Sequence, residues 1–470
     1  MTKPLIYGAA ALVALGAGAT GAWFWGAGRV GAAVDAQAQT LAAQGLRLTW
    51  AERSVSGFPF AYVVRLEDVT LADPAAGWSL TLPWTETAAP LLGGQVLRTT
   101  TAPTGALTGP DLGGSATFAL ALDGLTLDTP LVGAASARIA ADAIGLTATP
   151  TAELREARLR LGAVAGTLES FVGGGGKLDL RAGEMTAAFD VGGGGRTAVV
   201  ASDVAATATT DGGPRIDLDR LAAGEGSASV ELRVGALRSE GAEGVASTGV
   251  ASGRFGIVDG RLTYLADAQD VRIGVMLGRA GRGSARMARA TAGLDVPVRP
   301  APTPQAYTLQ LGLDAVELED ALWVALDPAG RLPRDPMGLA VDVGGRARVT
   351  GAVSPGELSA AGVAGTPVQV ETVEITRAAL HGLGARVAAQ GALTIVPGSP
   401  TPDGRIDLRA EGWAPVLETA VALGVVSSAD AATLLATAAR LGRADAGEGV
   451  FESRIELRDG QIWANGERVR

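Results

Sequence analysis

Apolar and polar residues alternate with a period of two along much of this chain, and this alternation restricts the fold more than any other feature. In residues 406–409, Ile and Leu occupy one set of alternate positions and Asp and Arg occupy the other. The same pattern recurs at residues 216–219, 230–234, 309–314 and 455–458. A strand with this pattern buries one face and wets the other, as strands of antiparallel sheets do. We therefore predict a mainly β fold, built as an elongated, twisted antiparallel sheet with a few short helices.

Asp-Gly pairs punctuate the alternating segments, at residues 123–124, 259–260, 403–404 and 459–460. A two-residue hairpin turn needs positive φ at its central residues, which Asp-Gly adopts readily. We predict a hairpin at each pair, after first strands at residues 46–50 and 61–71. The segments share no fixed repeat length, so a hairpin meander fits better than a regular solenoid.

Apolar residues recur at helical spacing in only a few places. These are residues 30–44, residues 320–326 and a helical pair at residues 414–442. Gly45 stands where a left-handed cap would end the first of these helices. Ser427 and Asp430 form a capping box at the start of the last helix, and Gly442 is expected to end it.

Residues 4–25 are apolar or small and carry no charge, and only Lys3 and the amino terminus precede them. At ~1.5 Å per residue this stretch reaches roughly 33 Å, enough for the ~30 Å hydrocarbon core, whereas a cleaved signal sequence needs an apolar region of only ~7–15 residues. We predict a transmembrane helix in a retained anchor at residues 1–29, with a cleaved signal as the alternative. The positive-inside rule places the rest of the chain across the membrane. Trp23 and Trp25 are expected at the membrane interface.

The Pro-rich run at residues 297–304 contains four prolines, which do not fit inside a sheet ladder. We predict a connector there, between a first β-rich region at residues 30–296 and a second at residues 305–470. The alternative is a connector along one continuous sheet.

Composition argues against several classes of function. The chain has no Cys, which removes disulfides and thiolate chemistry, and its net charge of −10 opposes nucleic-acid binding. Its single His, His381, has no second imidazole with which to form a triad or a His-rich metal site, and we expect a structural role for it. An all-oxygen calcium site among the acidic turns stays open as an alternative, but no EF-hand or calcium-repeat spacing supports it. We predict no catalytic residue, no metal and no cofactor.

Two further patterns have plain structural interpretations. The tetraglycine runs at residues 173–176 and 192–195 do not match a phosphate-binding loop, because Phe171 and Leu178 occupy positions that the motif reserves for Gly and for Ser or Thr. We expect flexible loop tips there. The carboxylate pairs at residues 217 and 219 and at residues 317 and 319 are typical of a solvated strand face, and not of the unequal acid pair that a glycosidase needs.

Three short phrases resemble a known family. Gly57-Phe58-Pro59 leads into a strand after the predicted span and helix, and residues 329–336 and 457–463 supply the later landmarks. In this pattern the chain resembles the membrane-anchored bacterial domain-of-unknown-function family 2125. The Gly-Phe-Pro phrase and the ending are also similar to those of AsmA-like envelope proteins. The resemblance implies a single-pass protein of the bacterial inner membrane with its bulk in the periplasm, or a secreted one if the segment is cleaved.

AsmA-like proteins are associated with lipid traffic and outer-membrane upkeep, so the resemblance suggests a function. We expect a non-enzymatic protein of lipid handling or cell-envelope maintenance, whose apolar sheet face shelters the chains of a phospholipid or another envelope lipid. The alternative is a periplasmic scaffold that docks a protein partner, whose identity is unknown, on a sheet edge. We rank an envelope hydrolase below both.

Overall fold

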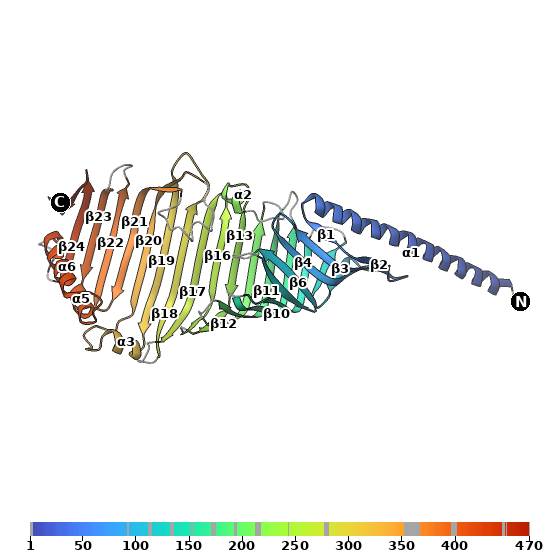
Figure 1. Ribbon diagram of the computed structural model, residues 1–470, viewed down its shortest axis with the longest axis horizontal. Coiled ribbons are helices and arrows are strands. Elements are labelled where there is room, and N and C mark those ends of the chain that lie inside the picture. The colour runs from blue at the N-terminus through green and yellow to red at the C-terminus, as the bar shows by residue number, and fades with distance from the viewer. Residues whose placement is uncertain are drawn as a thin grey trace. The chain divides into compact units, whose positions relative to one another are not determined.

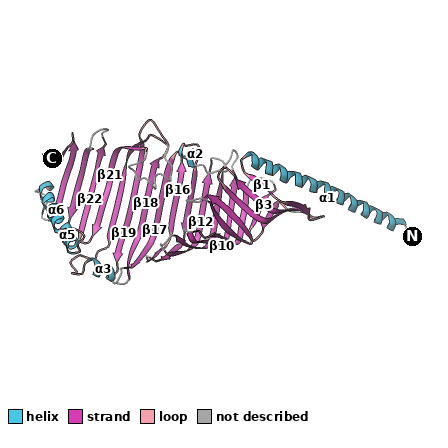
Figure 2. Ribbon diagram, in the orientation of Figure 1, coloured by secondary structure: helices cyan, strands magenta, loops and turns pink. Residues whose placement is uncertain are grey.

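The structure is a computed structural model, and the chain divides in it into two compact units, Met1–Thr207 and Ala208–Arg470. It describes residues 3–91, 94–110, 115–131, 136–151, 154–170, 175–191, 195–211, 218–242, 244–276, 282–351, 367–395, 402–443, 447 and 449–469. Within these ranges the side chains of residues 3–22, 110, 115, 218–219 and 275 are not described. Strands dominate both units and helices are few, as Figures 1 and 2 show. The mainly β prediction is confirmed.

The first unit begins with helix α1 and continues as antiparallel strands. Its elements are α1 (Lys3–Ala43), β1 (Arg47–Thr49), β2 (Glu52–Ser56), β3 (Ala61–Asp73), β4 (Trp78–Pro90), β5 (Val96–Thr101), β6 (Thr104–Pro110), β7 (Ser115–Asp123), β8 (Thr126–Pro130), β9 (Ser136–Ala148), β10 (Leu154–Ser170), β11 (Gly176–Val191) and β12 (Arg196–Thr210). The predicted early strands are confirmed as β1 and β3, whereas β2 was not predicted. Both β1 and β2 pair with β3, so they form one interrupted strand beside it.

The second unit is a meander. Its elements are α2 (Leu218–Ala222), β13 (Ala228–Val234), β14 (Ala236–Gly241), β15 (Gly244–Thr248), β16 (Ala251–Val258), β17 (Arg261–Met276), β18 (Arg282–Pro297), β19 (Gln305–Leu318), α3 (Asp320–Leu326), β20 (Met337–Val349), β21 (Val368–Gly382), β22 (Ala385–Thr394), β23 (Asp403–Glu411), α5 (Trp413–Ala422), α6 (Ser428–Leu441), β24 (Val450–Arg458), β25 (Gln461–Ala464) and β26 (Glu467–Arg468). From β16 to β26 each strand pairs antiparallel with the next. Figure 1 shows strands β16 to β24 side by side in chain order.

Two of the four predicted Asp-Gly hairpins are confirmed. Asp259 and Asp459 have φ of 52° and 53°, and each is followed by a glycine of positive φ in a two-residue turn between paired strands. The other two predictions are wrong. Asp123-Gly124 separates β7 from β8, which both pair with β9, so it interrupts a strand instead of reversing the chain. Asp403-Gly404 begins β23, and its glycine is needed for close strand approach, because a Cβ there would lie 2.2 Å from the Ala392 carbonyl oxygen.

A left-handed residue lies inside several strands. Asp68, Ala163, Asp203, Asp270 and Ala315 have φ of 50° or 51° within β3, β10, β12, β17 and β19. The pairs around Ala163 keep their register on both sides while Ala163 itself has no ladder partner. Ala163 therefore interrupts the ladder locally without displacing the pairing of the strand, whereas the β19–β20 pairing shifts its register across Ala315.

The predicted helices are mostly confirmed. Residues 320–326 form α3, and the pair at residues 414–442 is α5 and α6. The Ser427 side chain accepts the Asp430 N–H at 3.0 Å, and α6 ends before Gly442. Gly45 follows α1 with φ of 82°. The strand predicted at residues 216–219 is wrong at its second half, because residues 218–222 are helix α2.

Helix α2 packs onto the sheet and forms the core of the second unit. Leu221 and Ala222 lie against Ile257, Leu262 and Val349, each at most 7 % exposed. The burial of Leu221 outweighs the local alternation that predicted a strand. Tertiary contacts therefore decide the conformation here.

The Pro-rich segment 297–304 connects β18 to β19, which pair directly with each other inside the second unit. The division into compact units falls elsewhere, at Thr207 and Ala208. Among the residues whose side chains are described, no helix is both long and apolar enough to cross a membrane. Because the side chains of residues 3–22 lie outside that part, the anchor at residues 1–29 stays a prediction.

Candidate functional site

A row of large apolar side chains crosses five neighbouring strands of the second unit. Val230 of β13 lies opposite Phe255 of β16, which lies opposite Tyr264 of β17, and the row continues through Leu294 of β18 to Leu309 of β19. Directly opposed residues of antiparallel strands share one face of the sheet. Four of these five side chains are 42–47 % exposed. We call these five residues the apolar row.

The same face stays apolar beyond the apolar row. Leu309 lies opposite Val343 of β20, and Val343 lies opposite Ile375 of β21. Leu232 and Leu311, two positions from Val230 and Leu309, are also exposed. The apolar character therefore covers several strands and more than one line of residues.

The opposite face of these strands carries charges. Glu231 and Arg254 follow and precede members of the apolar row in their strands, so they lie on the other face, where they form an ion pair at 2.7 Å across the strands. Arg261 pairs with Asp295 at 2.7 Å on the same polar face. Leu265, which lies opposite Arg254, is an isolated apolar side chain among these charges. The sheet is thus amphipathic, with an exposed apolar face and an ion-paired polar face.

An exposed apolar face of this size needs an explanation. Soluble proteins rarely expose contiguous apolar patches larger than a few hundred Å², and larger patches mark binding surfaces. Within the part of the chain that the structure describes, helix α2 covers one end of the face, where Ile257 and Leu262 are buried. Leu294 of the apolar row packs partly against this buried cluster, while the other four side chains of the row remain exposed.

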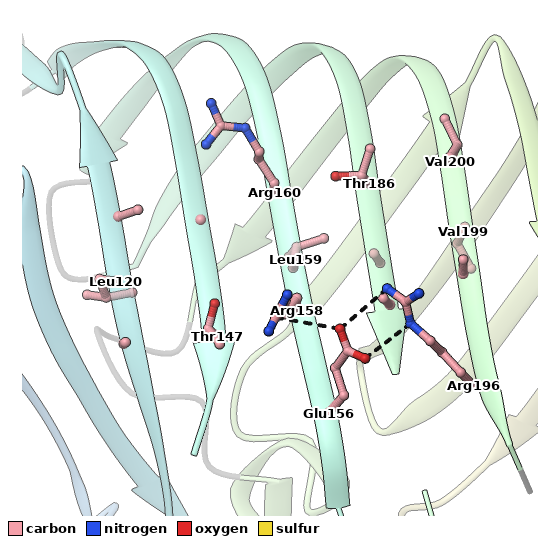
Figure 3. A pocket seen from close by; sticks show the side chains of 16 residues that line it. Leu120, Thr147, Glu156, Arg158, Leu159, Arg160, Thr186, Arg196, Val199 and Val200 are labelled. Carbon is pink, nitrogen blue, oxygen red and sulfur yellow. Dashed lines mark hydrogen bonds and ion pairs between the residues drawn. The ribbon is translucent and has the colours of Figure 1, made fainter. Parts of the chain in front are cut away.

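A second feature is a cavity of about 480 Å³ in the first unit, on strands β7, β9, β10, β11 and β12. Figure 3 shows Glu156 between two arginines, with its carboxylate 3.1 Å from Arg196 Nε and 3.5 Å from Arg158 Nε. Small side chains such as Ala119 and Ala188 leave the space above them open. The guanidinium groups are largely exposed and already paired, so this cavity provides ion pairs and no evident general base.

Of the residues singled out in the sequence, Trp23 and the Gly57-Phe58-Pro59 phrase lie together in the structure. The Trp23 indole N–H donates to the Ala61 carbonyl at 3.0 Å, and its ring meets Phe58 edge-on at 5.7 Å. Gly57, with φ of 98°, begins the turn that carries Phe58 and Pro59. Trp23 is thereby buried against the Gly-Phe-Pro turn, a contact that the sequence did not suggest.

Trp25 lies apart from this contact. Its side chain is 67 % exposed, and the Arg29 guanidinium lies 4.5 Å from the centre of its ring. The two tryptophans that were predicted to share one role therefore have different surroundings.

The other residues that the sequence analysis considered lie, where the structure describes them, in packing or ion-pair contacts with neighbouring strands. The His381 ring lies over Gly338 on the neighbouring strand, where a Cβ would come within 2.2 Å of it. Glu317 pairs with Arg286 at 2.8 Å on an exposed surface. Asp217 and most of the two tetraglycine runs lie outside the described residues. Within the described part of the chain, no group of three His, Cys, Asp or Glu side chains could hold a metal ion.

The fold and the apolar row define an antiparallel β protein whose sheet exposes one apolar face. The chain belongs to the bacterial family described as "Uncharacterized protein conserved in bacteria (DUF2125)", which matches residues 23–247 and 242–468. The family named from the Gly57-Phe58-Pro59 phrase is therefore confirmed. No curated protein and no solved structure matches the chain.

Proposed function

We propose that this protein is a membrane-anchored, non-enzymatic component of the bacterial cell envelope that handles lipid. The apolar row is the observation that supports this proposal, because it offers an exposed surface without charge. Its occupant would be the acyl chains of a phospholipid or another envelope lipid. The polar face would remain in water, where its ion pairs are solvated.

The size of the apolar row suits an acyl chain. Five strands spaced ~4.8 Å apart extend the row over about 19 Å. Half of the ~30 Å hydrocarbon core, the depth that the chains of one leaflet fill, is about 15 Å. One row therefore has room for the acyl chain of a single lipid.

The proposed location is the inner membrane, with the bulk of the chain in the periplasm. The uncharged stretch at residues 4–25 and the position of Lys3 before it support this orientation. Secretion after cleavage of the segment is the alternative. The similarity of the Gly57-Phe58-Pro59 phrase to AsmA-like envelope proteins agrees with an envelope role.

A scaffold that docks a partner on a sheet edge has less support. At β24 the Glu452 carbonyl accepts the Arg443 N–H at 2.8 Å, and Asn465 bonds both the N–H and the carbonyl of Arg454 at 2.8 Å. These bonds occupy backbone groups that a docked strand would need. We therefore give lipid handling precedence.

Photocrosslinking tests the proposal with the full chain in membrane vesicles. A photoactivatable phosphatidylethanolamine should label peptides of β13 and β16 to β19. Leu309→Gln removes one apolar side chain from the row. Covering the exposed part of Leu309 with an acyl chain would contribute about 1 kcal/mol, so the affinity for the lipid, measured from labelling at increasing lipid concentration, should fall about fivefold. Leu265→Gln is the matched control, since Leu265 is 50 % exposed on the polar face of the same strands. Equal labelling of the two variants would refute the proposal.

A further inference from the structure

Exposed aromatic rings gather where α1 meets the turn between β2 and β3. Phe24, Phe58 and Phe60 are each between 48 % and 68 % exposed. Leu91, whose N–H donates to the Phe60 carbonyl at 2.9 Å, is also exposed and extends the cluster onto the end of β4. We call Phe58, Phe60 and Leu91 the aromatic tip.

The tip carries no charge. Residues 54–64 and 87–97, which include it, contain no Asp, Glu, Lys or Arg. Water-exposed turns usually consist of Gly, Pro, Asn, Asp and Ser, and large aromatic rings are unusual there. Aromatic rings of this kind are stable at a membrane interface, where the ring meets the acyl boundary.

Trp23 holds α1 against the tip. Its ring stacks on Tyr62 with centroids 5.5 Å apart, and its N–H bonds to the Ala61 carbonyl. Gly26, one turn further along α1, allows this close approach, because a Cβ there would lie 1.9 Å from the Tyr62 hydroxyl oxygen. Arg53 adds bonds to the Gly31 carbonyl at 3.0 Å and to Asp35 at 2.6 Å.

This attachment lies at the carboxyl end of the apolar stretch, residues 4–25, that is proposed to cross the membrane. A segment fixed to α1 at Trp23 is therefore held at the level where the membrane would begin. We infer that the aromatic tip inserts into the headgroup and acyl boundary of the bilayer that holds the apolar stretch at residues 4–25. The inference rests on the proposed membrane anchor and is independent of lipid binding by the apolar row.

In this arrangement Trp23 is a positioning residue inside the protein, while Phe58 and Phe60 contact lipid. Arg29 follows Trp25 by one turn of α1 and holds its guanidinium over the Trp25 ring. A cation at that level suits the phosphate groups of the lipid headgroups. The sheet would then begin directly at the membrane surface.

Fluorescence quenching in lipid vesicles tests the inference, and the absence of Cys allows a single bimane label on each variant of the full chain. Labels would replace Phe60 in the tip, Leu12 in the apolar stretch and Val324, which is 64 % exposed in the second unit, as the control. A further label at Leu91 covers the case in which replacing Phe60 alters the tip. The vesicles contain phosphatidylethanolamine, phosphatidylglycerol and phospholipids that carry a nitroxide either high on the acyl chain or near its end.

We expect the labels at positions 60, 91 and 12 to lose fluorescence and the label at position 324 to keep it. Loss at position 12 without loss at positions 60 and 91 would overturn the tip inference and leave the anchor standing. Loss at none of these positions would overturn both. Either result is separate from the photocrosslinking of the apolar row, which reports on lipid handling alone.

Discussion

Ala163 is a position where we expect glycine to stabilise a strand. It lies inside β10 with φ of 51°, a left-handed conformation that costs a residue with a Cβ about 1–2 kcal/mol. Glycine removes this cost, but its greater freedom in the unfolded chain costs about 0.5–1 kcal/mol. Ala163→Gly should therefore raise the free energy of unfolding by about 0.5–1 kcal/mol.

Ala165 provides the matched control, because it is also exposed, lies in the same strand and has no positive φ. Ala165→Gly should lower the free energy of unfolding by about 0.5–1 kcal/mol. The entropy cost of glycine is common to both variants, so their difference of about 1–2 kcal/mol isolates the left-handed cost. Urea unfolding of the full chain by circular dichroism measures it, and hydrogen exchange of β10 peptides locates it. If Ala163→Gly destabilises as much as Ala165→Gly, the reasoning is wrong.

Two further predictions concern the second unit. Gly260→Ala should lower its thermal stability more than Gly424→Ala, since both glycines have positive φ but only at Gly260 would a Cβ collide, at 2.6 Å, with Arg299; equal melting shifts would contradict this. Two backbone N–H groups, chiefly that of Leu332, hold the pKa of Asp327 below its ordinary value. The stabilisation from its carboxylate is therefore present at neutral pH and lost as pH falls through the lowered pKa. Asp327→Asn should remove this acid dependence, measured by hydrogen exchange of the loop after α3 across a pH series.

The meander of the second unit followed from the sequence because its signals are local. Alternation identifies a strand, and the turn at residues 259–260 needs only its own two residues to reverse the chain. Asp123-Gly124 has the same composition, yet β7 and β8 on either side of it pair with one strand. Turn chemistry permits a reversal without requiring one, and the long-range pairing decided between the two outcomes.

A signal for the left-handed strand residues was present in the sequence. In β19 the apolar positions are odd-numbered up to Leu313 and even-numbered from Val316, and Ala315 between them has φ of 50°. The same slip of one position occurs in β3 between Leu66 and Val69, at Asp68. A search that counts alternating residues without checking whether the apolar positions are odd-numbered or even-numbered misses these left-handed residues.

The candidate site was harder to predict than the fold. Alternation shows that Val230, Tyr264 and Leu309 each lie on the apolar side of their own strand, but only register shows that they form one line. The sequence also cannot tell a covered apolar face from an open one. Helix α2, whose first two residues were predicted as strand and whose others had no prediction, covers one end of this face, so the extent of the open part depended on an element that the sequence did not predict.

The open face is difficult to explain as a purely structural feature. The ion pairs on the opposite face, such as Arg254 with Glu231, are more than half exposed, and pairs of this kind typically contribute only about 0.2–1 kcal/mol each. Folding removes about half of each of these large apolar side chains from water, and the half that stays exposed adds nothing to stability until something covers it. Polar residues at Val230, Phe255, Tyr264 and Leu309 would keep the strand pairing and improve solubility. Apolar residues at these opposed positions therefore gain further burial only if an apolar partner covers them, which is what the proposed function requires.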